Sequence, residues 1–291
     1  MVLIFKNITT VCRLILINFP TQNENYKFAG VWLLHSALSQ PRRRSSHGSL
    51  IHGSRFSPGF WPGRPSRRST GSASTVGGGD TAGAGGEILI HSTGAGDITL
   101  GAAVTANGGA SVEAADTGGL GGTVTVRNDS GAIVLHNLSS AGGAAGGGTA
   151  GAKGTLQLKS VGGTITQSGG TTLAGDSLKV VSDSDVTLNN ANALSTIAAS
   201  ITGAGKFFKY TDTDGVTVGT VAAVGGGGGA LQNLAAVTGI GTLGGASGVV
   251  TVTAGGLLTI DQAISTTPTA LNTVGGAITL TSSGAITSAG Q

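Results

Sequence analysis

Apolar and polar residues alternate in short segments along the last two-thirds of the chain. Alternation with a period of two is typical of a β-strand that has one buried face. Seven times, two such segments form a pair whose leading apolar residues stand eight to ten positions apart. The leading residues of the seven pairs are Ile88 and Ile98, Val124 and Ile133, Leu156 and Ile165, Leu178 and Val186, Phe208 and Val216, Val250 and Leu258, and Ile278 and Ile286.

The alternation also predicts which side chains point inward. Glycine, asparagine and aspartate separate the two strands of a pair, as in residues 92–97 and 128–131, and these residues tolerate a positive φ at a tight corner. The outward alternates are mostly threonine, glutamine or basic residues. The expected inward residues are Ile88, Ile90, Val124, Val126, Leu156, Leu158, Ile278 and Leu280.

A unit that recurs in this way cannot bury its apolar face alone, so neighbouring copies must stack to make a core. The second strands of successive pairs begin 35, 32, 21, 30, 42 and 28 residues apart. These intervals fit a coil with two tight corners and one variable loop. The glycine runs Ala141–Gly151 and Gly225–Gly229 are expected to be loops on one side. The sequence therefore predicts an all-β parallel β-helix (a solenoid), with an antiparallel sandwich of hairpins as the alternative.

Composition divides the chain in two. Residues 1–71 hold ten of the sixteen Lys and Arg and a single acid, for a net charge of +9, whereas residues 72–291 carry a net charge of −6. The repeat region therefore gives no reason to expect nucleic-acid binding, although the whole chain has a pI near 9.2. The only cysteine, Cys12, lies outside the repeats, which suits export without disulfides.

Residues 1–71 form a basic leader rich in Pro, Arg and Ser, without periodicity. Its apolar runs, Val11–Phe19 and Ala29–Leu38, are shorter than the roughly 20 residues of a membrane-spanning helix. One interpretation is a basic arm for nucleic acid or an anionic membrane. The favoured prediction is a disordered or irregular segment, or one that is not part of the mature protein, followed by the repeats of residues 72–291.

Stacked pairs would bring outward residues into columns. Threonine occupies six of the seven first outward positions of the second strands, where it either forms a structural ladder or organises water for ice binding. The partner positions are too mixed for a flat ice-binding plane, so a structural ladder is favoured. The predicted column is Thr99, Val134, Thr166, Thr187, Thr217, Thr259 and Thr287.

A second predicted column, on the first strands, begins with basic residues. Neighbouring cations about 5 Å apart repel one another unless anions compensate, so the column is either a solvated face or a contact for an acidic glycan. Its predicted members are His91, Arg127, Lys159, Val181, Thr253 and Thr281.

The repeats carry little that indicates catalysis. Acids stand two residues apart in the turns 182–185 and 211–215, as in calcium loops, but neither turn completes a known calcium motif. The aromatic residues Phe207, Phe208 and Tyr210 are expected to pack in the core or at a corner. A carbohydrate-processing enzyme would need clustered acids and aromatic residues in a groove. We therefore predict no enzyme, with no catalytic, cofactor-binding or metal residues and no cofactor.

The cadence of residues 275–287, Gly-Gly-x-Ile-Thr-Leu-x-Ser-x-Gly-x-Ile-Thr, resembles the repeats of bacterial exoproteins of the filamentous haemagglutinin type and of related autotransporter passengers. The resemblance covers residues 76–291. It implies a right-handed parallel β-helix, secretion to the bacterial outer surface through an outer-membrane transporter, and adhesion to host or matrix glycans or proteins. Gln291 follows a strand motif with no capping segment, so the sequence predicts a fragment of a longer protein.

The function predicted from the sequence is a non-catalytic structural or adhesive stalk of an exported surface protein. The alternatives are a carbohydrate-processing β-helix enzyme and an ice- or calcium-binding solenoid.

Overall fold

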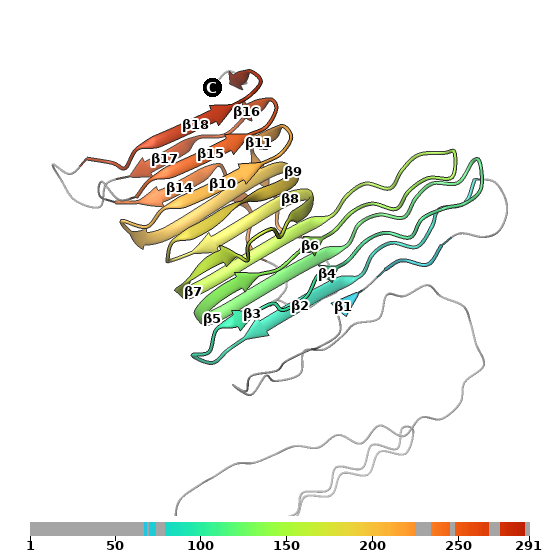
Figure 1. The fold of residues 1–291 in the computed structure, drawn as a ribbon, viewed down its shortest axis with the longest axis horizontal. Coiled ribbons are helices and arrows are strands. Elements are labelled where there is room, and N and C mark those ends of the chain that lie inside the picture. Colours follow the sequence, from blue (N-terminus) through green and yellow to red (C-terminus); the bar gives the residue numbers. More distant parts are fainter. Residues whose placement is uncertain are drawn as a thin grey trace, which may run out of the picture. The chain divides into compact units, whose positions relative to one another are not determined.

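The computed structural model describes residues 67–68, 70–73, 79–224, 234–244, 248–267 and 274–288. Within these ranges the protein is all-β, with nineteen strands and no helix, as the sequence predicts. Seventeen strands belong to one sheet. Their pairings are parallel, and Figure 1 shows β10, β15 and β18 side by side. The other two strands, β12 (Thr220–Val221) and β13 (Val237–Thr238), pair antiparallel.

Most of the predicted leader, residues 1–66, lies outside the described residues. The described end of this segment is paired with the repeats. Strand β1 (Arg67–Arg68) runs parallel to β4 (Val104–Thr105), and the amide of Gly71 donates to the carbonyl of Asn107 over 3.1 Å.

The parallel strands are arranged in rows, and row 1 contains the first strands of the early pairs. After β9, two short strands share each place in the row: β11 (Val216–Val218) with β14 (Ile240–Leu243), then β16 (Leu258–Ile260) with β17 (Ile264–Thr267), and finally β19 (Ile286–Ser288) alone. Before them, row 1 consists of β2 (Glu87–Ser92), residues 123–128 of β5 (Thr123–Leu135), residues 155–160 of β7 (Thr155–Gln167), residues 177–182 of β8 (Leu173–Ser182) and residues 196–201 of β9 (Val186–Ala204).

Two further rows complete the arrangement. Row 3 is short and contains β4, β6 (Leu138–Ser139) and the first residues of β8, with β9 beside them. Row 2 consists of β3 (Ile98–Thr99), residues 133–135 of β5, residues 165–167 of β7, residues 186–188 of β9, β10 (Phe208–Asp212), β15 (Val250–Ala254) and β18 (Ile278–Ser282).

The predicted inward residues of the early strands form the core. Val124, Val126, Leu156 and Leu158 are fully buried, and Ile88 and Ile90 are at least nine-tenths buried. Like residues lie on like residues along a row, and each buried aliphatic side chain stabilises the fold by about 1.5–3 kcal/mol. In the last strands the same positions are more open, since Ile278 is 43% exposed.

The predicted stacking order is wrong at one junction, between the fourth and fifth pairs, although the last three pairs stack on one another as predicted. Phe208 pairs with Val186, the second strand of the preceding pair, and Val216 begins β11, which pairs with Thr196 and Ile197 through its next two residues. The later pairs change rows because residues 196–201 of β9 form an additional row 1 strand that the alternation of apolar and polar residues did not predict. This strand has no Gly-Gly before it, and it places the small Ala199 at an inward position.

Three glycine-rich segments extend beyond the rows and pack on one another: residues 79–86, 106–122 and 140–154, here called the glycine layer. Figure 1 draws them as unarrowed cyan and green traces that run side by side. Their backbones hydrogen-bond directly, over 2.7–2.9 Å, without side chains between them. One continuous series of donors and acceptors runs from Gly151 to Gly143, Gly119, Gly109, Gly83 and Ser72.

Glycine is required in this layer because the backbones approach so closely. A Cβ placed on Gly143 would lie 1.8 Å from the carbonyl oxygen of Gly109, and one on Gly119 would lie 2.0 Å from that of Gly83. The predicted loop Ala141–Gly151 is therefore a packed element, held by backbone hydrogen bonds that any buried peptide group requires.

A polar cluster is buried at the corner after row 2. The hydroxyl of Tyr210 donates to Asp212 Oδ2 over 2.5 Å, and the amides of Leu194 and Asp214 donate to the same carboxylate. Burial raises the pKa of Asp212, and the hydrogen bonds from these donors only partly offset that rise. Phe208 and Tyr210 stack with ring centroids 6.4 Å apart, which confirms that these aromatic residues are core residues.

Candidate functional site

The outward face of row 1 carries a series of polar and charged side chains. A column crosses it, one residue per strand, at the position predicted to hold basic residues. Its first four members are as predicted, but Thr253 and Thr281 lie in row 2 beside Thr211. The observed column, here called the basic column, is His91, Arg127, Lys159, Val181, Ser200, Gly241 and Ser265.

Two of the three basic side chains share one acid. Asp129 accepts from Arg127 Nε through Oδ1 and contacts His91 Nε2 through Oδ2, both at 2.7 Å. Burial alone would raise the pKa of Asp129, but the hydrogen bonds from Arg127 and His91 outweigh it and lower that pKa. Asp129 therefore places a compensating negative charge beside Arg127 and within hydrogen-bonding distance of His91.

Lys159 is different, because none of the described acids forms an ion pair with it. Its strand neighbours in the column are Arg127 and the apolar Val181. The basic part of the column thus ends at Lys159, whose ammonium group has no acid partner in the described part of the chain and whose next neighbour, Val181, is apolar.

An insertion interrupts row 1 next to this column. The chain leaves the row after Val218, forms β12 and β13, and returns at Ile240; we call residues 219–224 and 234–239 the flap. At the return, Gly239 has φ +68° and a Cβ there would meet the carbonyl oxygen of Ala263 at 2.1 Å, so glycine is needed. The predicted glycine run Gly225–Gly229 lies outside the described residues.

A buried lysine fixes both ends of the flap to row 1. Lys179 Nζ donates to the carbonyl oxygens of Ala222 and Leu234, each over 2.9 Å, and the side chain is fully buried. Burial lowers the pKa of Lys179. Gln157 Oε1 also accepts from the amide of Leu234 over 3.3 Å. The flap is therefore held by polar contacts that compensate for the burial of a charge.

A small second core supports the flap from below. Val221 and Val237 of the flap pack with Ala198, and Val181 lies against them. These residues make outward-facing positions of row 1 apolar, which is unusual for a sheet face that faces water.

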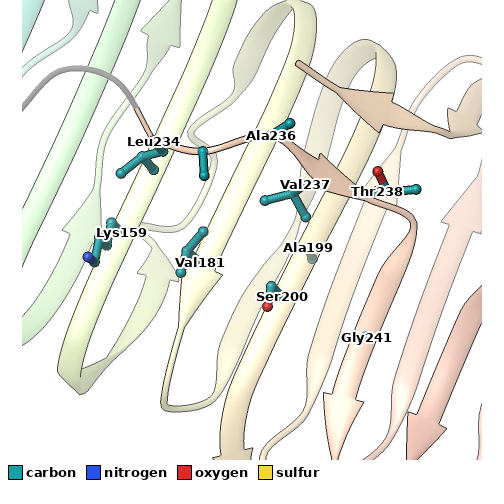
Figure 2. Close-up of a pocket in the computed structure, with 10 residues that line it drawn as sticks. Lys159, Val181, Ala199, Ser200, Leu234, Ala236, Val237, Thr238 and Gly241 are labelled. Atoms are coloured by element: carbon teal, nitrogen blue, oxygen red, sulfur yellow. The ribbon is translucent and has the colours of Figure 1, made fainter. Parts of the chain in front are cut away.

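A groove remains between the flap and the basic column. Figure 2 shows Lys159 and Thr238 far apart along it, with Val181 and Ser200 on the sheet side. Its volume is about 430 Å³, within the range of small-molecule sites. The residues that matter for its chemistry are Lys159, Val181, Ser200, Val237, Thr238 and Gly241.

The sequence search identified Lys159 and Val181 of this site but missed the flap residues and Lys179. Two signals were present. One is that the longest interval between repeats, 42 residues, contains the flap; the other is that a lysine, Lys179, stands at an outward position, although basic residues are common there. Neither signal indicates where an insertion folds back.

The predicted threonine column is divided between two rows. Thr187 pairs with Lys209 in row 2, and Thr217 pairs with Thr196 in row 1. The missed strand of β9 is again the cause. The resulting row 1 column begins with Glu87 and continues with residues that carry a hydroxyl group: Thr123, Thr155, Ser177, Thr196, Thr217, Thr259 and Thr287.

The acids in the turns accept hydrogen bonds from backbone amides of neighbouring strands. Asp97 accepts from the amide of Ala132 over 2.8 Å, and Asp183 accepts from that of Gly162 over 2.7 Å. Among the described residues, no three His, Cys, Asp or Glu side chains gather in a group that could hold a metal ion. The observed contacts of these acids are those of structural turn residues.

Comparison with protein-family models, with curated proteins and with solved structures finds no match to this chain. In the part of the chain that the structure describes, no helix has the length and apolar character needed to cross a membrane.

Proposed function

We propose that the protein is a right-handed parallel β-helix that acts as a non-catalytic structural or adhesive stalk on the outside of a bacterium. The observation that carries the proposal is the continuity of the rows: seven successive row 2 strands place like residues side by side from Ile98 to Ile278. An array of this kind resists deformation through many equivalent hydrogen bonds. The repeat cadence of residues 275–287 supports export and adhesion by resemblance.

The architecture is tested by engineered cross-links in a chain with Cys12→Ser. Paired parallel strands lie about 4.8 Å apart, within the Cα separations that a disulfide tolerates. Thr187→Cys with Lys209→Cys should form a disulfide under mild oxidation, because these residues pair in row 2. Thr187→Cys with Thr217→Cys, the order predicted from the sequence, should not. The reverse result would overturn the observed stacking order, and formation of neither disulfide would overturn the proposed β-helix.

The adhesive role is tested on a bacterial host that lacks its own adhesins. Surface display of the chain should increase attachment to a glycan-coated or matrix-coated support, and Ile133→Asp, which disrupts the core, should abolish the increase. Equal attachment by cells that display the parent chain and cells that display Ile133→Asp would contradict an adhesive role. Release of reducing sugar from pectic or host glycans would instead favour the alternative of a carbohydrate-processing enzyme.

A further inference from the structure

We propose that the groove between the flap and the basic column binds an acidic oligosaccharide of two or three sugar residues, with a uronate carboxylate against Lys159. This inference rests on the proposed adhesive function, because it assigns a ligand class to one face of the stalk. The groove is lined by groups that do not contribute to the core: one ammonium group without a described acid partner, two hydroxyl groups and, at its floor, a glycine without a side chain.

The length of the groove comes from the register of row 1. Lys159, Val181, Ser200 and Gly241 occupy four successive strands. Three strand spacings correspond to about 14 Å, which is the length of two to three linked sugar rings. A single small anion would occupy only the end beside Lys159.

Gly241 keeps the far end of the groove open. A Cβ at this position would meet no atom within 4 Å, and the residue does not have a left-handed φ. Neither close packing nor backbone conformation therefore requires glycine here, in contrast to Gly143 or Gly239. The missing side chain leaves space between Ser200 and the flap.

The charge of the groove selects an anion. Among the described residues, Lys159 is the one cation of the basic column that lacks an acid partner, and no Asp or Glu lines the groove. A carboxylate at Lys159 Nζ would form a charge-assisted hydrogen bond at a partly apolar site, where such bonds are strongest.

The hydroxyl groups favour a sugar over an aliphatic acid. Thr238 Oγ1 accepts a hydrogen bond from Thr220 Oγ1 over 3.2 Å, so its own proton is free to be donated to a ligand. Ser200 offers a second hydroxyl on the opposite wall. An aliphatic chain would desolvate both groups without replacing their bonds to water, whereas the hydroxyl groups of a sugar would pair with them.

The flap wall is fixed before a ligand arrives. Lys179 donates hydrogen bonds to Ala222 and Leu234, and Val237 packs in the second core. The segment 234–238 is therefore held near both of its ends. A preformed wall lowers the ordering cost of binding.

The experiment is calorimetric titration of the full chain with digalacturonate. We expect saturable binding, about tenfold weaker binding by Lys159→Met, and a similar loss by Gly241→Leu, which fills the open floor. Gly241→Leu should melt as the parent does. Lys209→Met removes the same charge from row 2, away from the groove, and should bind as the parent does.

Three results would overturn the groove assignment: no saturable binding by the parent chain, equal binding of a neutral disaccharide such as cellobiose, or binding of inorganic phosphate as tight as that of digalacturonate. A fourth would be equal loss of binding by Lys209→Met and Lys159→Met. Any of these would leave the proposed stalk intact if the Thr187–Lys209 cross-link forms. Failure of both the Thr187–Lys209 and the Thr187–Thr217 cross-links would reject the stalk whatever the saccharide result.

Discussion

The row 2 strands and the glycine layer both pack neighbouring backbones into an ordered layer, but row 2 does so with large side chains and the glycine layer without side chains. In row 2, aliphatic and aromatic side chains such as Val186, Phe208 and Val250 are fully buried and fill the space between backbones. In the glycine layer, backbones such as those of Gly119 and Gly143 meet directly, and no side chain could fit between them. The comparison shows that a chain poor in bulky residues can still build an ordered layer, provided that its peptide groups satisfy one another.

The difference also determines which substitutions each region tolerates. A row 2 position accepts another apolar residue of similar volume but not a charge. The close-approach glycines of the glycine layer, such as Gly119 and Gly143, accept no Cβ of any chemistry, because the obstacle is a carbonyl oxygen of a neighbouring backbone rather than a movable side chain.

The largest effect is expected in the core of row 2. Ile133 is fully buried, so Ile133→Asp would place a carboxylate without a partner among aliphatic side chains and should lower the free energy of unfolding by about 4 kcal/mol. Thr166→Val, on the outward side of the same row, should change it by only about 0.5 kcal/mol. Equal melting of the two variants by circular dichroism would contradict the assignment of inward and outward faces.

A smaller loss is expected from a single methyl group in the glycine layer. Gly143→Ala brings a Cβ to 1.8 Å from the oxygen of Gly109, so the backbones must separate, at a cost of about 3 kcal/mol. Amide hydrogen exchange should show lost protection at Gly119 and Gly151. The control is Gly101→Ala, where a Cβ meets nothing within 4 Å. Full protection in Gly143→Ala would show that the layer is not packed as described.

The buried polar cluster beside row 2 should be sensitive to one oxygen atom. Tyr210→Phe keeps the stacked ring but removes the donor to Asp212 Oδ2, and should cost about 2 kcal/mol in urea denaturation. An unchanged midpoint would mean that the 2.5 Å contact contributes nothing to stability.

The smallest effect is a dependence on pH. The pKa of Asp212 is raised by burial, so above the unfolded pKa, about 3.9, the folded chain retains a proton that the unfolded chain releases. The contribution of Asp212 is therefore fully present in acid and falls as pH rises through its folded pKa. The stability of the parent chain minus that of Asp212→Asn should decrease as pH rises above about 4 in urea titrations. An increase over that range would contradict the sign.

The pKa of Asp129 is lowered, so the corresponding difference for Asp129→Asn should run the other way. Its contribution should be present above the unfolded pKa and should be lost as pH falls through the lower folded pKa.

The amino-acid sequence by itself determined the strands of the seven repeat pairs, the inward residues of the early strands and the parallel pairing of like with like. These features follow from alternation and repetition, which are local and can be read one segment at a time. Ile88, Val124 and Leu156 needed no other information to be placed in the core.

Only the tertiary structure decided which strand follows which, where the flap lies and how the charges are matched. The order of stacking can be predicted only if every strand is identified. Residues 196–201 were not identified as a strand, because the small Ala199 weakens their alternation of apolar and polar residues. Asp129 reaches His91 across 38 residues, and Leu234 reaches Gln157 across 77. Such contacts depend on corner lengths and on the return path of inserted segments. Corner lengths and return paths bring together residues far apart in the sequence, and hydrophobic periodicity, which is local, does not predict them.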